Sequence, residues 1–397
     1  MIAEASRSSS RRFWALFAVG VLVVLAGLAA AHLMEERGHI VTGMNNRIVW
    51  ALPHVFAIFM VIAASGVLNV ANIHSVFGQS AYQSCAPLSG LLCIALVAGG
   101  VAVETLDLGR PERVILTMTH HNFTSVFAWN VFLYPGLIVI VAAYLATIMD
   151  RRHGARSGAV GVASFVWRIA LTTGTGSVFA FLVARQAYGT AVLIPLLLAM
   201  SFAWGLALFL VAQSAFCRWN GIALPAEVRR RMRNLLALFV LVVLFFVLIY
   251  HLTNGYFAKQ IAFERFILRD GGVYPQLFWW GYVGAGSLVP LFLLWGPRSP
   301  AARDGLAAPL LVIVGAFALL YVFIIGGQAF PLELFPGYRT ASTFGDGVIQ
   351  AYVPTLPELA LGLSGVGIAF LIALVGVRLF DFLPHDVAPA AQGAGTD

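Results

Sequence analysis

The sequence contains few charged residues and few cysteines. Only 10% of its 397 residues are Asp, Glu, Lys or Arg, whereas 60% are hydrophobic. The three cysteines, Cys85, Cys93 and Cys217, form neither a CxxC pair nor a CxxCH sequence. Their spacing excludes an iron–sulfur cluster held by this chain alone, c-type haem attachment and a disulfide framework. These absences indicate a chain that is not a complete electron-transfer unit.

The sequence also lacks any polar stretch long enough to form a soluble domain. Apolar runs of about twenty residues recur instead, and the mean hydropathy is +0.89, which is typical of polytopic α-helical membrane proteins. We expect an all-α fold of about ten transmembrane helices, with two four-helix bundles and flanking helices in one integral membrane domain over residues 1–397. The expected spans are roughly 13–32, 49–70, 86–106, 126–148, 162–184, 190–214, 234–253, 277–296, 307–328 and 357–379, with a short polar tail over 384–397.

Basic residues are distributed unevenly among the loops between these spans. With the N-terminus in the cytoplasm, 14 of the 24 Lys and Arg residues fall on the cytoplasmic side and nine on the outer side, while Arg168 lies within a span. The positive-inside rule then predicts that both termini face the cytoplasm. The net charge of +7 arises from loop residues, which offer no basic face for a nucleic acid.

The first apolar run follows a pair of arginines. Ser10, Arg11 and Arg12 resemble a twin-arginine export signal. The run that follows is about 19 residues long, however, and this exceeds the apolar core of a signal peptide. We therefore expect the first helix to be retained.

Charged residues gather in one short segment between two apolar spans. Positions 104 to 121 hold Glu104, Asp107, Arg110, Glu112, Arg113, His120 and His121. Charge at a lipid boundary is costly unless it has partners or a function. The predicted topology brings this segment to the outer interface, where the ends of neighbouring spans supply further polar residues: His54, Thr124, Trp129, Asn130 and Arg185.

This gathering of polar residues has two interpretations. The first is a binding site for a ligand with a polar head and an apolar tail, in which His54 hydrogen-bonds a quinone carbonyl and exchanges its proton. The second is a structural cluster at helix ends, in which Asp107 pairs with Arg110 three residues later. On the first interpretation His54 and Asp107 are the reacting groups, and we predict no metal site.

Titratable residues are scarce within the spans themselves. Only His54 and His251 are histidines inside a predicted span. The chain therefore lacks histidine ligands for two membrane haems, although these two residues could ligate one haem. The sixth to ninth spans contain no carboxylate. We therefore expect no relay of Asp and Glu residues for protons through that part of the chain.

Three motifs carry a resemblance to a known family. DLGRPERV at the end of the third span, NFTSVFAWN at the start of the fourth and YVPTLPEL before the last resemble the NrfD/polysulfide-reductase family of membrane subunits. The resemblance covers nearly the whole chain. The run WALPHVFAIFMVIAASGVLNVANI and the loop QAFPLELFPGYRT are most similar to the branch associated with dissimilatory sulfite reductase, which implies a place in sulfur metabolism.

The resemblance implies a quinone-binding anchor subunit of a respiratory oxidoreductase complex. Menaquinone or ubiquinone would be its bound substrate, with no haem or iron–sulfur cluster in this chain. Its partners would be an extracytoplasmic ferredoxin-like iron–sulfur subunit, further membrane and cytochrome subunits, and membrane lipid. His54 matches the family's pocket histidine, and the flanking motifs supply Asp107, Arg110, Thr124 and Trp129; Glu104 and Asn130 complete the predicted site.

Other functions remain open at this point. A secondary transporter would fit ten spans, but transporters pair broken helices in their two halves, and Gly174 and Gly176 in the fifth span have no counterpart. A scaffold that binds lipid without reacting is a second alternative. The chain could also anchor a different complex of the same family, such as a hydrogenase, a polysulfide reductase or a tetrathionate reductase.

Two outer segments are candidates for the partner contact. The loop from Gln328 to Pro357 is rich in aromatic residues and prolines and poor in charge, which is unlike a disordered linker. We expect this loop, together with Asp107–Arg113, to contact the iron–sulfur subunit. The alternative is a loop that packs only on its own helices.

Overall fold

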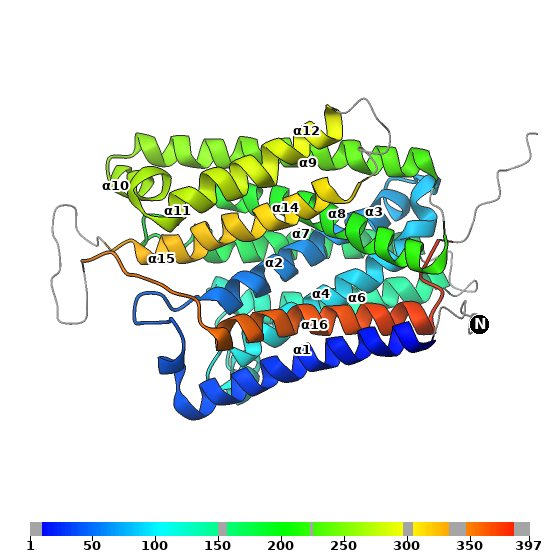
Figure 1. The fold of residues 1–397 in the computed structure, drawn as a ribbon, viewed down its shortest axis with the longest axis horizontal. Helices are drawn as coiled ribbons and strands as arrows, with labels where there is room; N and C mark the ends of the chain where they lie inside the picture. The colour runs from blue at the N-terminus through cyan, green and yellow to red at the C-terminus, as the bar shows by residue number, and fades with distance from the viewer. Residues whose placement is uncertain (1–9, 150–156, 223–224, 297–304, 333–346, 385–397) are drawn as a thin grey trace, which may run out of the picture.

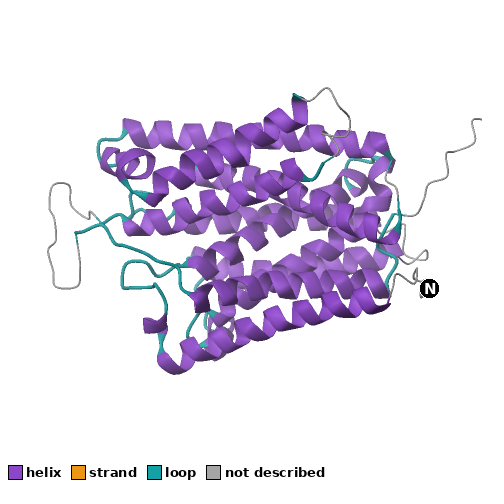
Figure 2. Cartoon of the chain, viewed as in Figure 1, coloured by secondary structure: helices purple, strands orange, loops and turns teal. Residues whose placement is uncertain are grey.

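The computed structural model describes residues 10–149, 157–222, 225–296, 305–332 and 347–384. Over these ranges the fold is all-helical, as the sequence predicts, and the helices lie side by side along one direction (Figures 1 and 2). Nine of the helices in the described ranges are long and apolar enough to cross a membrane. The chain is therefore a multi-pass α-helical membrane protein.

The first four-helix bundle consists of α2 (Leu52–Val67), α4 (Ala86–Leu106), α6 (Val126–Met149) and α7 (Ser157–Ala180), each packed on its neighbours. Pro53 lies in the first turn of α2, where its missing N–H costs no helical hydrogen bond. A short helix, α3 (Asn69–Ser75), continues α2. The apolar residues of α2 are almost all buried, as expected for a helix that is surrounded by protein rather than lipid.

The second bundle contains α8 (Leu193–Asn220), α9 (Ala226–Tyr256) and two composite spans. One composite runs through α11 (Val273–Gln276), η6 (Leu277–Leu288) and α12 (Val289–Trp295), and the other through α14 (Ala307–Leu320), η7 (Tyr321–Gly326) and α15 (Gly327–Ala329). Both η6 and η7 are π-helical, a conformation that often marks functional positions in helices.

Two flanking helices complete the architecture. Helix α1 (Ser10–Arg37) lies along α16 (Leu356–Leu379), which in turn packs on α2 and α4 of the first bundle (Figure 1). The two bundles meet where α8 packs on α2 and α7. This arrangement confirms the prediction of two four-helix bundles with flanking helices.

Helix α7 overlaps the predicted span 162–184 but is not among the nine apolar spans. It is 24 residues long, and its serines, threonines, glycines and Arg168 lower its hydropathy. The Arg168 side chain is buried, with its guanidinium 4.8 Å from the ring centre of Phe165 and 5.2 Å from that of Phe202. Because α7 packs between α6 and α8, its polar residues face protein instead of lipid.

Because consecutive helices alternate in direction, most of the predicted site residues lie at the same end of the molecule. We call it the site end: α2, α6, α8 and α16 begin there, and α4, α7 and α9 end there (left in Figure 1). Its loops carry η1 (His39–Val41), α5 (Val114–Thr119), α10 (Ile261–Arg265) and η5 (Phe266–Asp270). Helix α1 begins and α16 finishes at the opposite end. Within the predicted partner loop, residues 333–346 lie outside the described residues.

Candidate functional site

The His54 side chain lies in the first turn of α2 and stacks on an indole. Its ring centre is 5.3 Å from that of Trp50, with an angle of 10° between the planes. Trp50 in turn makes an edge contact with Phe179 at 5.5 Å and approaches Tyr188 at 6.4 Å. Among the described residues, none forms a hydrogen bond with the His54 imidazole, which is half-buried. The ring is thus held in place by aromatic contacts while its nitrogens remain available to a ligand.

The segment that carries Trp50 is fixed by the buried amide of Gln328. The Gln328 Oε1 accepts hydrogen bonds from the N–H groups of Val49 and Trp50, both at 3.0 Å. Its Nε2 donates to the carbonyls of Trp50 at 2.8 Å and Ile324 at 2.9 Å. These four bonds use the hydrogen-bonding capacity of the amide. Gln328 therefore positions Trp50, and through Trp50 the His54 ring.

Arg185 joins the same arrangement from the connection between α7 and α8. Its guanidinium donates to the Gln328 carbonyl at 3.1 Å and to the Arg47 carbonyl at 2.8 Å. The Tyr188 hydroxyl donates to the Ile324 carbonyl at 3.0 Å. The sequence predicts that Arg185 lies near the site. In the structure its two hydrogen bonds link the second bundle to the segment before α2.

A buried carboxylate, Glu358, holds the first residue of α2 from the other side. Its Oε2 accepts from the N–H of Thr355 at 2.7 Å and from the Thr355 hydroxyl at 2.9 Å, which forms a capping box at the start of α16. Its Oε1 accepts from the Tyr352 hydroxyl at 3.1 Å, and that hydroxyl accepts from the Leu52 N–H at 2.9 Å. Glu358 is fully buried, so these bonds replace its lost hydration.

Three carboxyl groups therefore lie close together at the site end. Asp107 ends α4 and is within electrostatic range of both Glu104 and Glu358. Its Oδ1 is buried without a hydrogen-bond partner among the described residues, and its backbone carbonyl contacts His39 Nε2 at 3.3 Å. Burial, assisted by the charge of Glu358, raises the pKa of Asp107 to about 7. A carboxyl group with this pKa exchanges protons at neutral pH.

The predicted residues at the start of α6 are more widely spread. Thr124 is exposed and bonds to Asn122 Oδ1 within its own turn, and the Trp129 indole donates to the Phe123 carbonyl at 2.8 Å. Asn130 is buried, and its Oδ1 has no hydrogen-bond partner in the described ranges. Phe127 links this region to the site, because its ring centre is 6.3 Å from that of Trp50.

Arg110 is exposed on the loop that follows α4. Over the described ranges no ion pair joins it to Asp107, so the pairing proposed in the second, structural interpretation is not observed. The structure thus groups His54 with Trp50, and Asp107 with Glu104 and Glu358. Arg110, Thr124 and Trp129 are exposed and belong to neither group.

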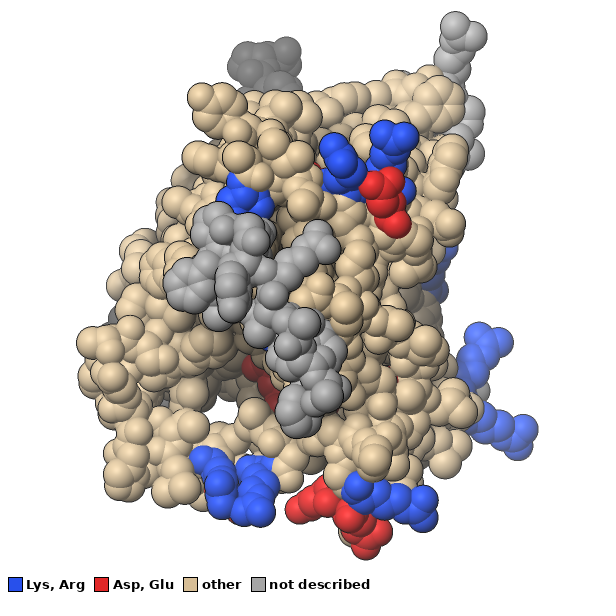
Figure 3. All heavy atoms as spheres, turned by 90° about the vertical axis from the view of Figure 1, so that its left-hand side faces the viewer, with Lys and Arg blue, Asp and Glu red and all other residues tan. Residues whose placement is uncertain are grey.

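The surface around this site is mainly uncharged. Seen from the site end, Lys, Arg, Asp and Glu side chains lie mostly toward the edges, and a hollow opens near an acidic side chain (Figure 3). Within the described part of the chain, no group of three or more His, Cys, Asp or Glu residues is placed to hold a metal ion.

Comparison with known proteins gives the family context. The profile of the family described as polysulphide reductase, NrfD, matches residues 40–332. An Hdr-like menaquinol oxidoreductase integral membrane subunit from Archaeoglobus fulgidus is 26% identical over 95% of both chains. A protein from Halobacterium salinarum, named as a membrane subunit of dimethyl sulfoxide reductase, is 24% identical over 96% of this chain and 93% of its own. A selenate reductase subunit from Mesobacillus selenatarsenatis is 20% identical over 91% and 93%.

Proposed function

The chain belongs to the polysulphide reductase NrfD family, and from that premise we propose that it is the quinone-reactive membrane anchor of a multi-subunit oxidoreductase. The observation that carries the proposal is the His54 imidazole, stacked on Trp50 and without a hydrogen bond from the described residues. An ionisable group within a membrane helix is costly unless it serves a function. The names of the relatives, which include a menaquinol oxidoreductase subunit, support the choice of a quinone.

The chemistry of the site suits a quinone head group. Conversion of a quinol to a quinone releases two protons and two electrons, and the reverse reaction takes them up. His54 accepts one proton on an imidazole nitrogen, and Asp107 accepts the other at near-neutral pH. The unpartnered Asn130 Oδ1 and Asp107 Oδ1 are acceptors for ligand hydroxyl groups, since buried polar atoms are normally hydrogen-bonded.

The electrons require an acceptor or donor outside this chain. Its cysteines, Cys85, Cys93 and Cys217, are free and buried and have no spacing suited to a cluster. We place a ferredoxin-like iron–sulfur subunit against the site end, on the extracytoplasmic face of a bacterial inner membrane, with both termini of this chain in the cytoplasm. The similarity of the second span and the last outer loop to the branch associated with dissimilatory sulfite reductase supports sulfur metabolism as the setting.

The experiment that tests this function is quinol-dependent reduction by the purified complex. The complete complex should oxidise a short-chain quinol, and the same preparation without this chain should not, while its soluble subunits still accept electrons from a chemical donor. A transporter would show substrate flux without quinol oxidation. A lipid-binding scaffold would leave quinol oxidation intact after this chain is removed.

A first prediction concerns the pH dependence of turnover. Because the pKa of Asp107 is about 7, its carboxylate form increases as the pH rises from about 6 to about 8. Quinol oxidation should therefore rise across this range, and Asp107→Asn should remove the rise and lower the rate at about pH 8 by about tenfold. Steady-state turnover at saturating quinol, measured in steps of pH, checks this expectation.

The same carboxyl group links stability to pH. The folded pKa lies above the ordinary value of about 3.9 for Asp, so the folded chain binds more protons than the unfolded one between about pH 4 and 7. Stability should fall as the pH rises through that window and stay level above it. Asp107→Asn should remove this part of the dependence.

The kinetic prediction has its own contradicting outcome. An unchanged pH dependence of turnover in Asp107→Asn would contradict the role of Asp107 in proton exchange.

A second prediction concerns the partner contact at the site end. Several apolar side chains at this end are exposed: Ile115 of α5 at 67%, Val353 before α16 at 72%, and Leu356, the first residue of α16, at 81%. Ile115 and Val353 lie outside the membrane-spanning helices, where exposed apolar side chains are candidates for contact with a partner subunit. A cysteine at Val353 or Ile115 should react with a membrane-impermeant maleimide from the extracytoplasmic side in the free subunit, and at least about tenfold more slowly in the assembled complex.

The chain supplies its own control for this labelling. The native cysteines are all buried, so the introduced thiol gives the main signal. A cysteine at Leu379, exposed at the opposite end, should react only from the cytoplasmic side and equally with and without partners. Reaction of Val353→Cys from the cytoplasm alone would overturn the orientation, and equal rates before and after assembly would overturn the docking surface.

A further inference from the structure

The connection between α9 and α11 is folded onto the second bundle. We call residues 257–272 the α10 segment; it contains α10 and η5 and lies between two candidate membrane spans. Glu264 of this segment is buried, with its Oε2 2.6 Å from His251 Nδ1 and its Oε1 accepting from Asn254 Nδ2 at 2.8 Å. Since both carboxylate oxygens contact α9, the segment is held at a fixed place on that helix.

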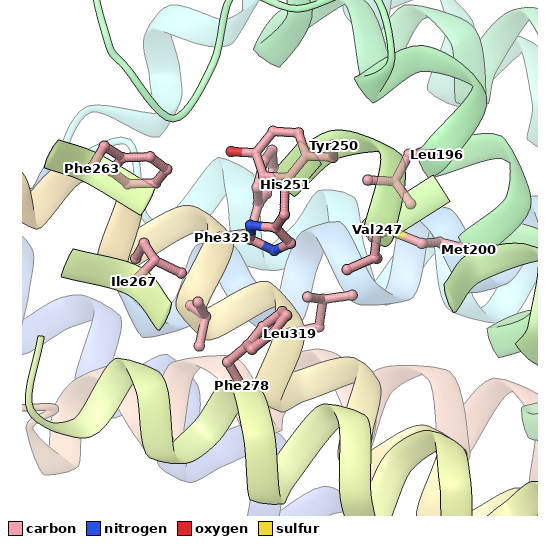
Figure 4. Close-up of a pocket in the computed structure, with 11 residues that line it drawn as sticks. Leu196, Met200, Val247, Tyr250, His251, Phe263, Ile267, Phe278, Leu319 and Phe323 are labelled. Carbon is pink, nitrogen blue, oxygen red and sulfur yellow. The ribbon is translucent and has the colours of Figure 1, made fainter. Parts of the chain in front are cut away.

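Apolar side chains fix the same segment from its inner side. Phe263 and Ile267 are buried and project into the interior of the second bundle, toward His251 (Figure 4). The Trp279 indole donates a hydrogen bond to the Leu268 carbonyl at 2.9 Å. The α10 segment is therefore an ordered part of the bundle that lies outside the membrane spans.

The outer side of the α10 segment is basic. Lys259, Arg265 and Arg269 are exposed, against one exposed acidic residue, Asp270. The Arg269 side chain is 84% exposed, and its Nε is 3.7 Å from Asp270 Oδ1, so this surface pair contributes little. Lys259 and Arg265 form no ion pair within the described part of the chain. Figure 3 shows basic side chains beside an acidic one at the upper edge of the site end.

This concentration of positive charge is opposite to the bias that sets membrane topology. On the predicted orientation, nine of the 24 basic residues lie on the outer side, and three of these nine belong to the α10 segment. Lys and Arg are normally concentrated in the cytoplasmic loops. Positive charge on this outer segment is therefore explained better by binding than by topology.

Exposed aromatic residues lie next to these charges. Tyr256 and Phe257, where α9 ends, are 85% and 52% exposed. Aromatic residues and Arg are enriched in the contacts between protein subunits. The α10 segment thus combines an ordered backbone, positive charge and exposed aromatic rings on one surface.

The α10 segment is also joined to the predicted site in the first bundle. The rings of Phe263 and Phe266 lie 5.7 and 5.6 Å from the ring of Phe330. Phe330 follows Gln328 by two residues, and Gln328 bonds to the segment that carries Trp50. A partner that binds the α10 segment therefore contacts the structure that positions the predicted site.

We propose that the α10 segment binds an acidic surface of an extracytoplasmic protein subunit of the same complex. Lys259, Arg265 and Arg269 pair with carboxylates of that subunit, and Tyr256 and Phe257 pack against it beside these pairs. The inference rests on the proposed function, because it takes the partner to be a subunit of the same oxidoreductase. It adds a contact in the second bundle and the sign of the partner's charge, which steers association and sets its salt dependence.

The sequence offers a direct probe of this surface. Lys259 is the only lysine in the chain, so every acylated lysine of this chain is Lys259. In phosphatidylcholine nanodiscs, a membrane-impermeant N-hydroxysulfosuccinimide ester should acylate Lys259 of the free chain, as measured by mass spectrometry of its peptide. Assembly with the partner subunits should slow this acylation at least about tenfold.

A water-soluble carbodiimide identifies what covers the lysine. This reagent joins an amine to a carboxylate in direct contact, so in the complex it should link Lys259 to an Asp or Glu of a partner subunit. Lys259→Arg keeps the charge and removes the amine. That variant should assemble normally and lose the link.

Charge reversal tests the energetic role of the surface. The double variant Arg265→Glu, Arg269→Glu should weaken binding of the partner about tenfold at low salt, with a smaller difference at high salt. Arg37→Glu is the matched control, because Arg37 is also exposed at the site end but lies on α1. Its affinity for the partner should stay within about twofold of the wild type.

Three outcomes would overturn the docking surface. They are equal acylation of Lys259 before and after assembly, absence of any carbodiimide link to a partner, and equal affinity of the double variant and Arg37→Glu. Protection that phosphatidylglycerol alone produces in the free chain, with no increase on assembly, identifies a lipid surface and also overturns the proposal.

Quinol oxidation by the same samples separates this inference from the proposed function. A complex that oxidises quinol while Lys259 stays fully reactive refutes only the docking surface. A complex in which Lys259 is protected but quinol is not oxidised refutes only the proposed function.

Discussion

Replacement of His54 by alanine should lower quinol turnover of the assembled complex by about 10²-fold, the usual scale for loss of a positioned proton acceptor. The His54 ring stacks on Trp50 and makes no hydrogen bond with the described residues. Its removal therefore leaves no donor or acceptor of those residues unsatisfied, and the chain should still fold and assemble. Steady-state turnover with a short-chain quinol, normalised to the amount of co-purified partner subunits, measures the effect.

Two further variants separate chemistry from packing. His54→Gln retains a polar side chain but no proton acceptor in this pH range, so it should lose most of the turnover as well. His74→Ala is the matched histidine control, because His74 lies on α3 at the opposite end of the first bundle, and its turnover should stay within about twofold of the wild type. Normal turnover in an assembled His54→Ala complex would rule out His54 as the proton acceptor.

The gathering of His54, Glu104 and Asp107 at one end follows from hydropathy and chain direction. Apolar runs mark the helices, and consecutive helices alternate in direction, so the start of α2 and the end of α4 must lie at the same level. This logic requires no knowledge of side-chain contacts. It predicts which residues lie at the same membrane face, but it does not predict which of their side chains are in contact.

The contacts that organise the site were not predicted from the sequence. Gln328 bonds to Trp50, 278 positions away, and Tyr352 bonds to Leu52, 300 positions away, and no local pattern encodes such pairs. A local signal did exist for Glu358, because Thr355 and Glu358 have the spacing of a capping box at a helix start. Gln328 also stands out as an amide at the end of an apolar span, which indicates a buried partner.

The contact between His251 and Glu264 could not be predicted from the sequence for a different reason. The predicted spans six to nine contain no carboxylate, and hydropathy assigns Glu264 to the loop between two of them. In the structure this loop contains α10, which places Glu264 against α9 within reach of His251. Hydropathy locates spans well, but it cannot predict that a connecting segment folds back onto its own bundle.

The two bundles approach each other tightly where α2 crosses α8, at Gly66 and Gly205. A Cβ atom at Gly205 would lie 2.2 Å from the carbonyl carbon of Gly66 and 2.3 Å from the nitrogen of Val67. Both neighbours are backbone atoms, which cannot rotate away, so the helices would have to separate. Small residues permit such close packing of membrane helices, where dispersion and hydrogen bonds replace the hydrophobic effect.

Gly205→Ala should therefore destabilise the chain by about 3 kcal/mol or more, at the upper end for an overpacked core, and sharply reduce the yield of assembled complex. Thermal unfolding of the purified subunit in detergent, followed by circular dichroism, measures the loss. Gly255→Ala is the matched control, because Gly255 also lies in a helix but, apart from the nearby backbone of that helix, has no described atom within 4 Å of the position that a methyl group would take. That variant should be as stable as the wild type or slightly more so, since alanine favours the helix. Equal stability of the two variants would mean that the two bundles do not meet through this crossing.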